Sequence, residues 1–277
     1  MTIRALFFDI DGTILNSKGV MNPIVFESLL ECKRKGILVS IVTARSGRIV
    51  FRVNEIPGDR NLLLDRGIFY NGGTIFDKQH NFYQHIPIPG EIVNRIVSHV
   101  QKANDHLQIA LQHDNIYHAF KYKMNDDELI GWGFSGNDIH DFMNSQTNPA
   151  TKIMVFGGKE WRNISGDLSD LYHDLLGTFG KSVNLILADS KKCIYILSKY
   201  ASKGIAIKKL ISFYNINPEE VAVFGDDTPD IGMFDMFGQS IAMGNAHDSL
   251  KSIASYVTLS NDEDGVVHAL KNHLKII

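Results

Sequence analysis

Short, uninterrupted apolar runs alternate with segments of helical spacing at the start of the chain. Ala5–Phe8 is apolar at every position and is followed by an acid, which is typical of a strand buried on both faces of a parallel sheet. Segment 22–35 has helical spacing, with Pro23 suited to a first helical turn, and 37–42 is a second buried run. A further helix is expected over 47–54. This order of strand, helix, strand and helix predicts a doubly wound α/β domain.

The last third of the chain returns to the same pattern. Its apolar positions predict helices over 203–214, around 231–237, over 248–254 and from Gly265, with buried strands over 221–224 and 240–243. These elements extend the parallel sheet of the first segment.

The middle of the chain has a different pattern. Asn71-Gly72-Gly73 reads as a turn into a hairpin strand. The elements expected after it are helices over 89–103 and 168–179 and strands over 107–112, 115–120, 152–156, 183–187 and 193–197. Such a mixture is α+β and antiparallel. We therefore predict one α/β domain, residues 1–82 and 191–277, interrupted by an inserted α+β domain at 83–190.

Composition narrows the class of protein. The chain has 277 residues, of which 44% are hydrophobic and 21% charged, and a formal net charge of −3. An ordinary globular composition without a basic excess argues against nucleic acid or an anionic membrane as partner. No apolar stretch approaches the roughly 20 residues of a membrane span, and the N-terminal apolar run is too short for a signal peptide. Two distant cysteines, Cys32 and Cys193, predict a reducing, cytoplasmic location.

Two of the buried runs end in clusters of acids. Asp9 and Asp11 follow the first strand, and Asp226, Asp227 and Asp230 follow the strand near residue 224. Ligands of open α/β sheets bind outside the carboxyl ends of the strands, so both clusters should share one crevice. Carboxylates this close repel unless a cation lies among them, and hard oxygen ligands suit Mg²⁺ better than Zn²⁺.

Helix capping and calcium binding account for these acids less well. Acids near turns often cap helices, but capping fits one cluster better than two that each follow an apolar strand. A calcium-binding EF-hand loop is excluded because no glutamate falls at the twelfth position.

Thr43 and Lys203 add groups that bind anions. Thr43 follows the second buried strand, so its hydroxyl can meet an anion in the same crevice. Lys203 is expected at a helix N-terminus, where free N–H groups favour phosphate. Alone, each residue has an ordinary structural role. Together with the acids, they indicate a site for a phosphorylated ligand.

Four segments resemble, in order, the motifs of the haloacid dehalogenase-like (HAD) phosphatases. These are Phe8-Asp9-Ile10-Asp11-Gly12-Thr13, Val42-Thr43-Ala44-Arg45, Ser202-Lys203-Gly204 and Gly225-Asp226-Asp227-Thr228-Pro229-Asp230. Three more are similar to the Cof-type subfamily: Asn71-Gly72-Gly73, Met243-Gly244-Asn245-Ala246 and Asp264-Gly265-Val266. The insert lies between the second and third motifs, where this subfamily carries a type IIB cap domain.

The resemblance implies a Rossmann-like core with an α+β cap of the C2B type and a Mg²⁺-dependent phosphatase mechanism. Asp9 would be the nucleophile, Asp11 the general acid and base, and Lys203 would hold Asp9 and the phosphoryl group. The implied metal ligands are Asp9, Asp11 through its backbone carbonyl, Asp226 and Asp230. The implied substrate-binding residues are Gly12, Thr43, Ala44, Arg45, Lys203 and Asn245.

The sequence departs from the family pattern at three positions. Ala44 replaces the usual glycine and keeps the backbone amide. Pro229 replaces an asparagine and has neither an N–H nor a side-chain amide. Asp227 replaces serine or asparagine and should add negative charge beside the metal.

Two alternatives to a phosphatase stay open. One is a phosphotransferase such as a sugar-phosphate mutase, which would use the same aspartyl-phosphate. The other is a non-catalytic binding protein with the same fold, which Pro229 and Asp227 make conceivable. The substrate is expected to be a small phosphorylated metabolite, and the oligomeric state, monomer or dimer, stays open. The insert should act as a lid. His113, Tyr117 and Trp132 are candidates for its specificity residues, although packing accounts for each of them more simply.

Overall fold

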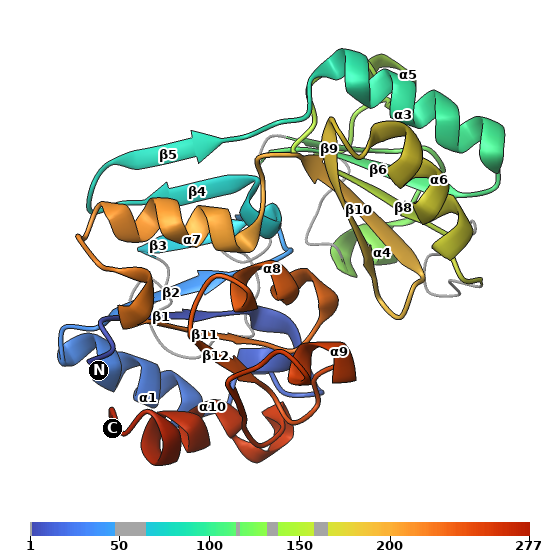
Figure 1. Ribbon diagram of the computed structural model, residues 1–277. Coiled ribbons are helices and arrows are strands. Elements are labelled where there is room, and N and C mark those ends of the chain that lie inside the picture. Colours follow the sequence, from blue (N-terminus) through green and yellow to red (C-terminus); the bar gives the residue numbers. More distant parts are fainter. Residues whose placement is uncertain (1, 48–64, 115–116, 132–137, 158–165) are drawn as a thin grey trace. The chain divides into compact units, whose positions relative to one another are not determined.

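The computed structural model describes residues 2–47, 65–114, 117–131, 138–157 and 166–277 (Figure 1). The chain divides into two compact units, one made of Met1–Gln84 with Ser202–Ile277 and the other of His85–Ala201. The helix expected over 47–54 lies, from residue 48 on, outside the described residues. No described helix has the length and apolar character needed to cross a membrane.

The first unit is built on an eight-stranded sheet of order β13-β12-β11-β1-β2-β3-β4-β5. Pairing is parallel from β13 to β3 and antiparallel between β3 and β4. The strands are β1 (Ala5–Phe8), β2 (Leu38–Val42), β3 (Arg66–Phe69), β4 (Thr74–Asp77), β5 (Phe82–His85), β11 (Val221–Gly225), β12 (Gln239–Ala242) and β13 (Tyr256–Val257). With β1 between β2 and β11, the acidic segments after β1 and β11 leave the sheet at the same edge.

Helices cover both faces of this sheet, which explains why β1 is apolar at every position. Leu6 and Phe8 pack in one core cluster with α1 and α10, whereas Ala5 and Phe7 pack in another with α7, α8 and α9. Alternate side chains of a strand point to opposite faces, so both sets are buried. The helices are α1 (Pro23–Arg34), α7 (Lys203–Ser212), α8 (Ile231–Phe234), α9 (Asp248–Lys251) and α10 (Gly265–His268), the last continued by a π-helical turn, Ala269–His273.

The second unit contains a five-stranded antiparallel sheet of order β7-β6-β8-β10-β9. The apolar faces of α3 and α6 contribute to its core. Its elements are α3 (Gly90–Ala103), β6 (Gln108–His113), β7 (Tyr117–Phe120), α4 (Asp126–Gly131), α5 (Phe142–Ser145), β8 (Lys152–Phe156), α6 (Ser169–Phe179), β9 (Val183–Ala188) and β10 (Cys193–Ser198). A parallel-sheet α/β core with a separate antiparallel α+β insert confirms the predicted fold class.

The boundary of the second unit differs from the predicted one. We expected the core to resume at residue 191, but β10 follows that residue and pairs with β8 and β9. Because β10 is an interior strand of the antiparallel sheet, the second unit ends at Ala201, just before α7.

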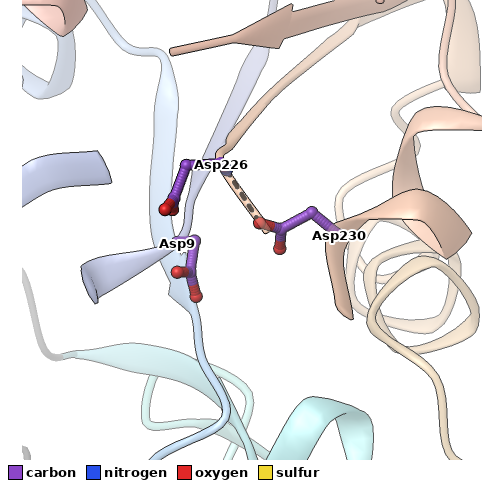
Figure 2. A group of neighbouring side chains, drawn as sticks. All are labelled: Asp9, Asp226 and Asp230. Atoms are coloured by element: carbon purple, nitrogen blue, oxygen red, sulfur yellow. Dashed lines mark hydrogen bonds between the residues drawn. The ribbon is translucent and has the colours of Figure 1, made fainter. Parts of the chain in front are cut away.

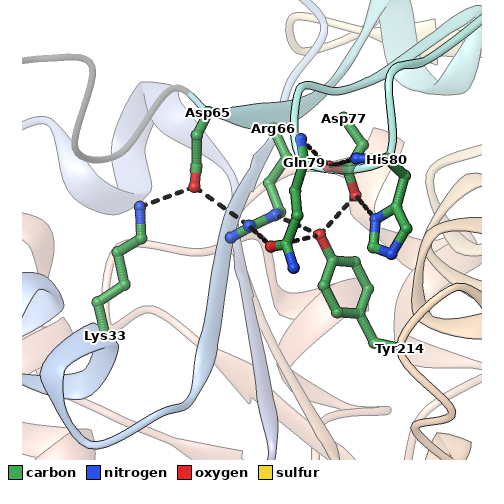
Figure 3. A network of polar contacts seen from close by, with 7 residues as sticks. All are labelled: Lys33, Asp65, Arg66, Asp77, Gln79, His80 and Tyr214. Carbon is green, nitrogen blue, oxygen red and sulfur yellow. Dashed lines mark hydrogen bonds and ion pairs between the residues drawn. The ribbon is translucent and has the colours of Figure 1, made fainter.

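A polar network lies at the amino-terminal end of β3, at the sheet edge opposite the acidic segments (Figure 3). Asp77 Oδ2 accepts a hydrogen bond of 2.6 Å from the Tyr214 hydroxyl and lies 3.2 Å from His80 Nδ1. Arg66 donates to the Tyr214 oxygen at 3.2 Å and to Gln79 Oε1 at 3.2 Å. These contacts fasten the hairpin after β4 to the segment that follows α7.

Asp65 extends the same network towards α1. Its Oδ2 lies 3.1 Å from Lys33 Nζ and 3.1 Å from an Arg66 guanidinium nitrogen (Figure 3). We call Lys33, Asp65, Arg66, Asp77, Gln79, His80 and Tyr214 the amino-end network.

Candidate active site

Lys203 and Asp9 form a buried ion pair at the carboxyl ends of the parallel strands. Lys203 is the first residue of α7 and is 2% exposed, and Asp9 directly follows β1. Lys203 Nζ donates to Asp9 Oδ1 at 2.6 Å and to Asp230 Oδ1 at 2.6 Å. The start of the helix is fixed by Ser202, whose hydroxyl accepts from the Ile205 N–H. A buried lysine therefore joins the acids of both strand ends.

Glycines allow the helix start to lie close to neighbouring backbone. A Cβ at Gly72, where φ is +99°, would lie 2.3 Å from the Ser202 carbonyl oxygen, and one at Gly204 would lie 2.3 Å from the Gly232 oxygen. Sequence reasoning attached Gly72 to a turn and missed this close approach, because the two segments are far apart along the chain. Gly72 and Gly204 thus support the placement of Lys203.

Asp226 and Asp230 lie beside Asp9, as Figure 2 shows. Asp230 Oδ2 accepts from the backbone N–H of Asp226 at 3.0 Å and of Asp227 at 3.2 Å. The Thr13 hydroxyl donates to Asp226 Oδ1 at 3.0 Å. One oxygen each of Asp9, Asp226 and Asp230 lies within 4.8 Å of the others. We call Asp9, Asp226, Asp230 and Lys203 the acidic cluster.

Gly12 lets the first motif pass next to Asp226. Its φ is +72°, and a Cβ there would lie 2.1 Å from Asp226 Oδ2. Any larger residue would be strained and would collide with the carboxylate. The glycine of the first motif is therefore explained by the packing of the acidic cluster itself.

The acidic cluster carries more negative charge than its lysine balances. Burial raises the pKa of Asp9, and the nearby Asp230, Asp226 and Asp11 raise it further against the opposing effect of Lys203. Burial and the Asp230 carboxylate likewise raise the pKa of Asp226 to about 7. Three carboxylates whose oxygens converge beside Lys203 fit a hard divalent metal ion, which would offset the excess negative charge.

Asp11 and Arg45 are paired by two hydrogen bonds. Arg45 Nε donates to Asp11 Oδ2 at 2.8 Å, and a terminal guanidinium nitrogen donates to Oδ1 at 2.6 Å. Thr43 is fully buried, and its hydroxyl accepts from the Arg45 N–H at 3.1 Å. Ala44 lies between these two residues in the segment after β2. The second motif is thereby brought to the second acid of the first motif.

Asn245 contacts the backbone of the first motif. Its side-chain amide donates to the Gly12 carbonyl at 2.9 Å, and its oxygen accepts from the Asn261 N–H at 2.9 Å. Asn261 in turn donates to the Leu15 carbonyl at 2.8 Å. These contacts connect the loop after Asp9 to the segment around Asn261, and the expected contact of Asn245 with substrate stays a prediction. Asn261 lies outside every motif and was not identified from the sequence, and the first motif contains Thr13 but does not signal its contact with Asp226.

The two departures in the fourth motif have local structural reasons. Pro229 lies in the first turn of a short 3₁₀ helix, Thr228–Asp230, where an N–H has no helical partner to lose. The Asp227 carboxylate caps this turn by accepting from the Thr228 N–H at 2.7 Å, and it lies 3.6 Å from His247 Nε2. Asp227 is not one of the three grouped carboxylates, but its negative charge contributes to the raised pKa of Asp226.

Two of the three candidate lid residues are described. The rings of His113 and Tyr117 stack with centroids 4.3 Å apart, and the His140 ring stacks on that of Tyr117 at 3.9 Å. His113 is 4% exposed, and burial lowers the pKa of its imidazole. Trp132 lies outside the described residues.

Comparison with known proteins identifies the class. A sequence model of the haloacid dehalogenase-like hydrolases matches residues 6–270. Phosphatase YwpJ of Bacillus subtilis is 28% identical, with 98% of this chain and 100% of that protein covered. The 5-amino-6-(5-phospho-D-ribitylamino)uracil phosphatase YwtE of the same organism is 27% identical, with 96% of each chain covered. A solved subclass IIB sugar phosphatase has a TM-score of 0.81 at 23% identity, covering 99% of this chain and 100% of its own.

The match over nearly the whole chain shows that this protein belongs to the haloacid dehalogenase-like hydrolase family. The resemblance inferred from the motifs is therefore confirmed, as is the prediction that the chain is a hydrolase of this family. The structural neighbour confirms the fold, a HAD core with the insert of subclass IIB.

Proposed function

We propose that this protein is a Mg²⁺-dependent phosphatase that hydrolyses a small phosphorylated metabolite, such as a sugar phosphate, through an aspartyl-phosphate on Asp9. The observation that carries the proposal is the contact of the buried Lys203 with Asp9 and Asp230, next to Asp226. The phosphatase names of the relatives YwpJ and YwtE support the reaction class.

The proposed chemistry proceeds in two transfers. A carboxylate oxygen of Asp9 forms a bond to phosphorus while the bond from phosphorus to the leaving oxygen breaks, and Asp11 gives its proton to that oxygen. Water then attacks the aspartyl-phosphate and loses a proton to Asp11, so phosphate leaves and Asp9 is regenerated. Lys203 keeps Asp9 oriented and offers positive charge to the phosphoryl oxygens, together with the Thr43 hydroxyl.

The acidic cluster would hold the metal through Asp9, Asp226 and Asp230, with the Asp11 carbonyl as a further ligand. Bound there, Mg²⁺ would reduce the repulsion between Asp9 and an anionic substrate and stabilise the charge of the transferring group. We also propose that the unit His85–Ala201 is the cap domain and that it sets substrate selectivity.

A screen of phosphorylated metabolites with Mg²⁺, with phosphate release as readout, tests the proposal. We expect activity to disappear with excess chelator and in Asp9→Asn. Glu27→Gln serves as the control, because Glu27 lies on α1 and forms an exposed pair with Arg34. Conversion of a sugar phosphate to its isomer without phosphate release would instead support the phosphotransferase. Binding without turnover, unchanged in Asp9→Asn, would support a non-catalytic protein.

A further inference from the structure

The side chain of Arg45 binds the carboxylate of Asp11 through two hydrogen bonds. The contacts of 2.8 and 2.6 Å run from two nitrogens of the guanidinium fork to the two carboxylate oxygens. Such a bidentate pair fixes the plane of the carboxylate as well as its position. A lysine in the same place could fix neither in this way, since an ammonium is a point charge.

Arg45 is itself well anchored, whereas Asp11 is exposed. The Arg45 N–H donates to the Thr43 hydroxyl, and its carbonyl accepts from the Tyr70 N–H at 3.0 Å. The Arg45 side chain is 20% exposed and that of Asp11 is 57% exposed. An exposed carboxylate has several rotamers available, and the pair with the less exposed Arg45 favours one of them.

We propose that Arg45 is a positioning residue that orients Asp11 for proton transfer, and not a ligand of the substrate's phosphoryl group. This inference rests on the proposed phosphatase function. An ionised carboxylate offers about four lone pairs. Arg45 occupies two of them, so another can carry the proton that Asp11 gives to the leaving oxygen and later takes from the attacking water. If Arg45 instead bound the substrate, as expected from the sequence, its loss would change kcat/KM in a different way.

The two roles separate with phenyl phosphate and p-nitrophenyl phosphate as substrates. The phenolate leaves poorly and needs a proton from Asp11, whereas the p-nitrophenolate is a weaker base and leaves without one. The ratio kcat/KM reports the first transfer, from substrate to Asp9. We would measure it with Mg²⁺ for the wild type, Arg45→Gln, Arg45→Lys, Asp11→Asn and the double variant Asp11→Asn/Arg45→Gln. Arg4→Gln is the control, since Arg4 pairs with Glu220 near the amino end of β1.

We expect Arg45→Gln to lower kcat/KM for phenyl phosphate by about 10- to 100-fold and for p-nitrophenyl phosphate by less than about threefold. Arg45→Lys should show the same preference with a smaller loss. In the Asp11→Asn background, Arg45→Gln should add no further loss, because the group it orients is already gone. Arg4→Gln should match the wild type.

An equal loss on both substrates, persisting in the Asp11→Asn background, would overturn the inference and restore a substrate-binding role for Arg45. Thermal unfolding of each variant identifies any loss that comes from misfolding, and Arg45→Lys keeps the test available if Arg45→Gln does not fold. Failure of the proposed function looks different, since the wild type itself would then release phosphate from neither ester.

Discussion

The core unit buries two polar clusters at opposite edges of one sheet, and they differ in charge balance. In the amino-end network, Asp77 is fully buried, and both of its oxygens accept hydrogen bonds, from the Gln79 N–H at 2.9 Å and the Tyr214 hydroxyl at 2.6 Å. In the acidic cluster, Lys203 contacts Asp9 and Asp230, and Asp226 adds a third carboxylate. Lys33 and Arg66 balance the two acids of the first cluster, Asp65 and Asp77, whereas in the second cluster one lysine faces three carboxylates.

The pKa values of the acids follow this difference. Burial raises the pKa of Asp77, but hydrogen bonds from Tyr214 and His80 and the charge of Arg66 outweigh burial, so the net shift is downward. Burial and the hydrogen bond to Asp77 raise the pKa of the Tyr214 hydroxyl to about 12. The pKa values of Asp9 and Asp226 are raised instead. Removing one partner from a balanced buried cluster destabilises the fold, whereas raised pKa values and excess charge are typical of a site that binds a ligand or cation.

The largest expected effect is the difference in kcat between a variant of the acidic cluster and a variant of the amino-end network. Asp226→Asn removes a proposed metal ligand and should lower kcat by about 10³-fold, since a metal bound there would contribute several kcal/mol to the stability of the transition state. Asp77→Asn should leave kcat within about twofold, because Asp77 lies at the other edge of the sheet. Phosphate release under saturating Mg²⁺ measures both. A comparable loss in Asp77→Asn, in protein shown to be folded, would contradict the assignment of this network to stability alone.

The stabilities of the same two variants should change in opposite directions. Asp77→Asn leaves Tyr214, His80 and Arg66 around a neutral side chain, and should lower the free energy of unfolding by about 3 kcal/mol. Asp226→Asn removes an unbalanced charge, and should raise the free energy of unfolding of the metal-free protein by about 1 kcal/mol. Urea unfolding at pH 8 in the presence of chelator gives both values. If both variants were destabilised equally, the two clusters would not differ in charge balance as described.

Added Mg²⁺ should distinguish the clusters by binding linkage. A cation that binds only the folded protein at 100 times its dissociation constant stabilises it by about 2.7 kcal/mol. We expect this increment in the wild type and in Asp77→Asn, but not in Asp226→Asn. The measurement is the rise in Tm between chelator and excess Mg²⁺, with Ca²⁺ as a comparison ion. An equal rise in all three proteins would place the bound cation elsewhere.

The strands that lead into these clusters could be predicted from the sequence, but the contacts between separate segments could not. Uninterrupted apolar runs identified β1 and β11, and the bounds of β8 were predicted as observed, because strand periodicity is a local signal. The strand over 193–197 was expected among the antiparallel elements, but the predicted boundary at residue 191 lies before β10, whose pairing with β8 and β9 depends on tertiary packing. The Arg45–Asp11 pair and the contact from Asn245 to Gly12 join separate motifs, so motif spacing alone could not show them.

The amino-end network illustrates the same limit more strongly. Arg66, Asp77 and Tyr214 have no motif between them, and each alone reads as an ordinary surface or strand-end residue. Their mutual contacts arise only when α7 packs beside the β4 hairpin. Buried charges outside a recognisable motif are therefore visible in the structure and not in the sequence.

The smallest expected effect is the pH dependence of the two stability differences. The folded-state pKa of Asp77 is depressed, so its contribution is fully present above the unfolded value of about 3.9 and is lost as the pH falls through the lower folded value. The destabilisation by Asp77→Asn should therefore be constant from pH 8 to about pH 5 and shrink at more acid pH.

The folded-state pKa of Asp226 is raised to about 7, so the folded protein binds the extra proton between about pH 4 and pH 7. As the pH rises through that window, the free energy of unfolding of the metal-free wild type falls. The difference in free energy of unfolding in favour of metal-free Asp226→Asn should therefore grow as the pH rises and level off above about pH 7. Urea unfolding of the three proteins at pH 3, 4, 5, 6, 7 and 8 with chelator gives both curves. Two curves with the same sign, or with the same pH window, would show that one electrostatic environment governs both edges of the sheet.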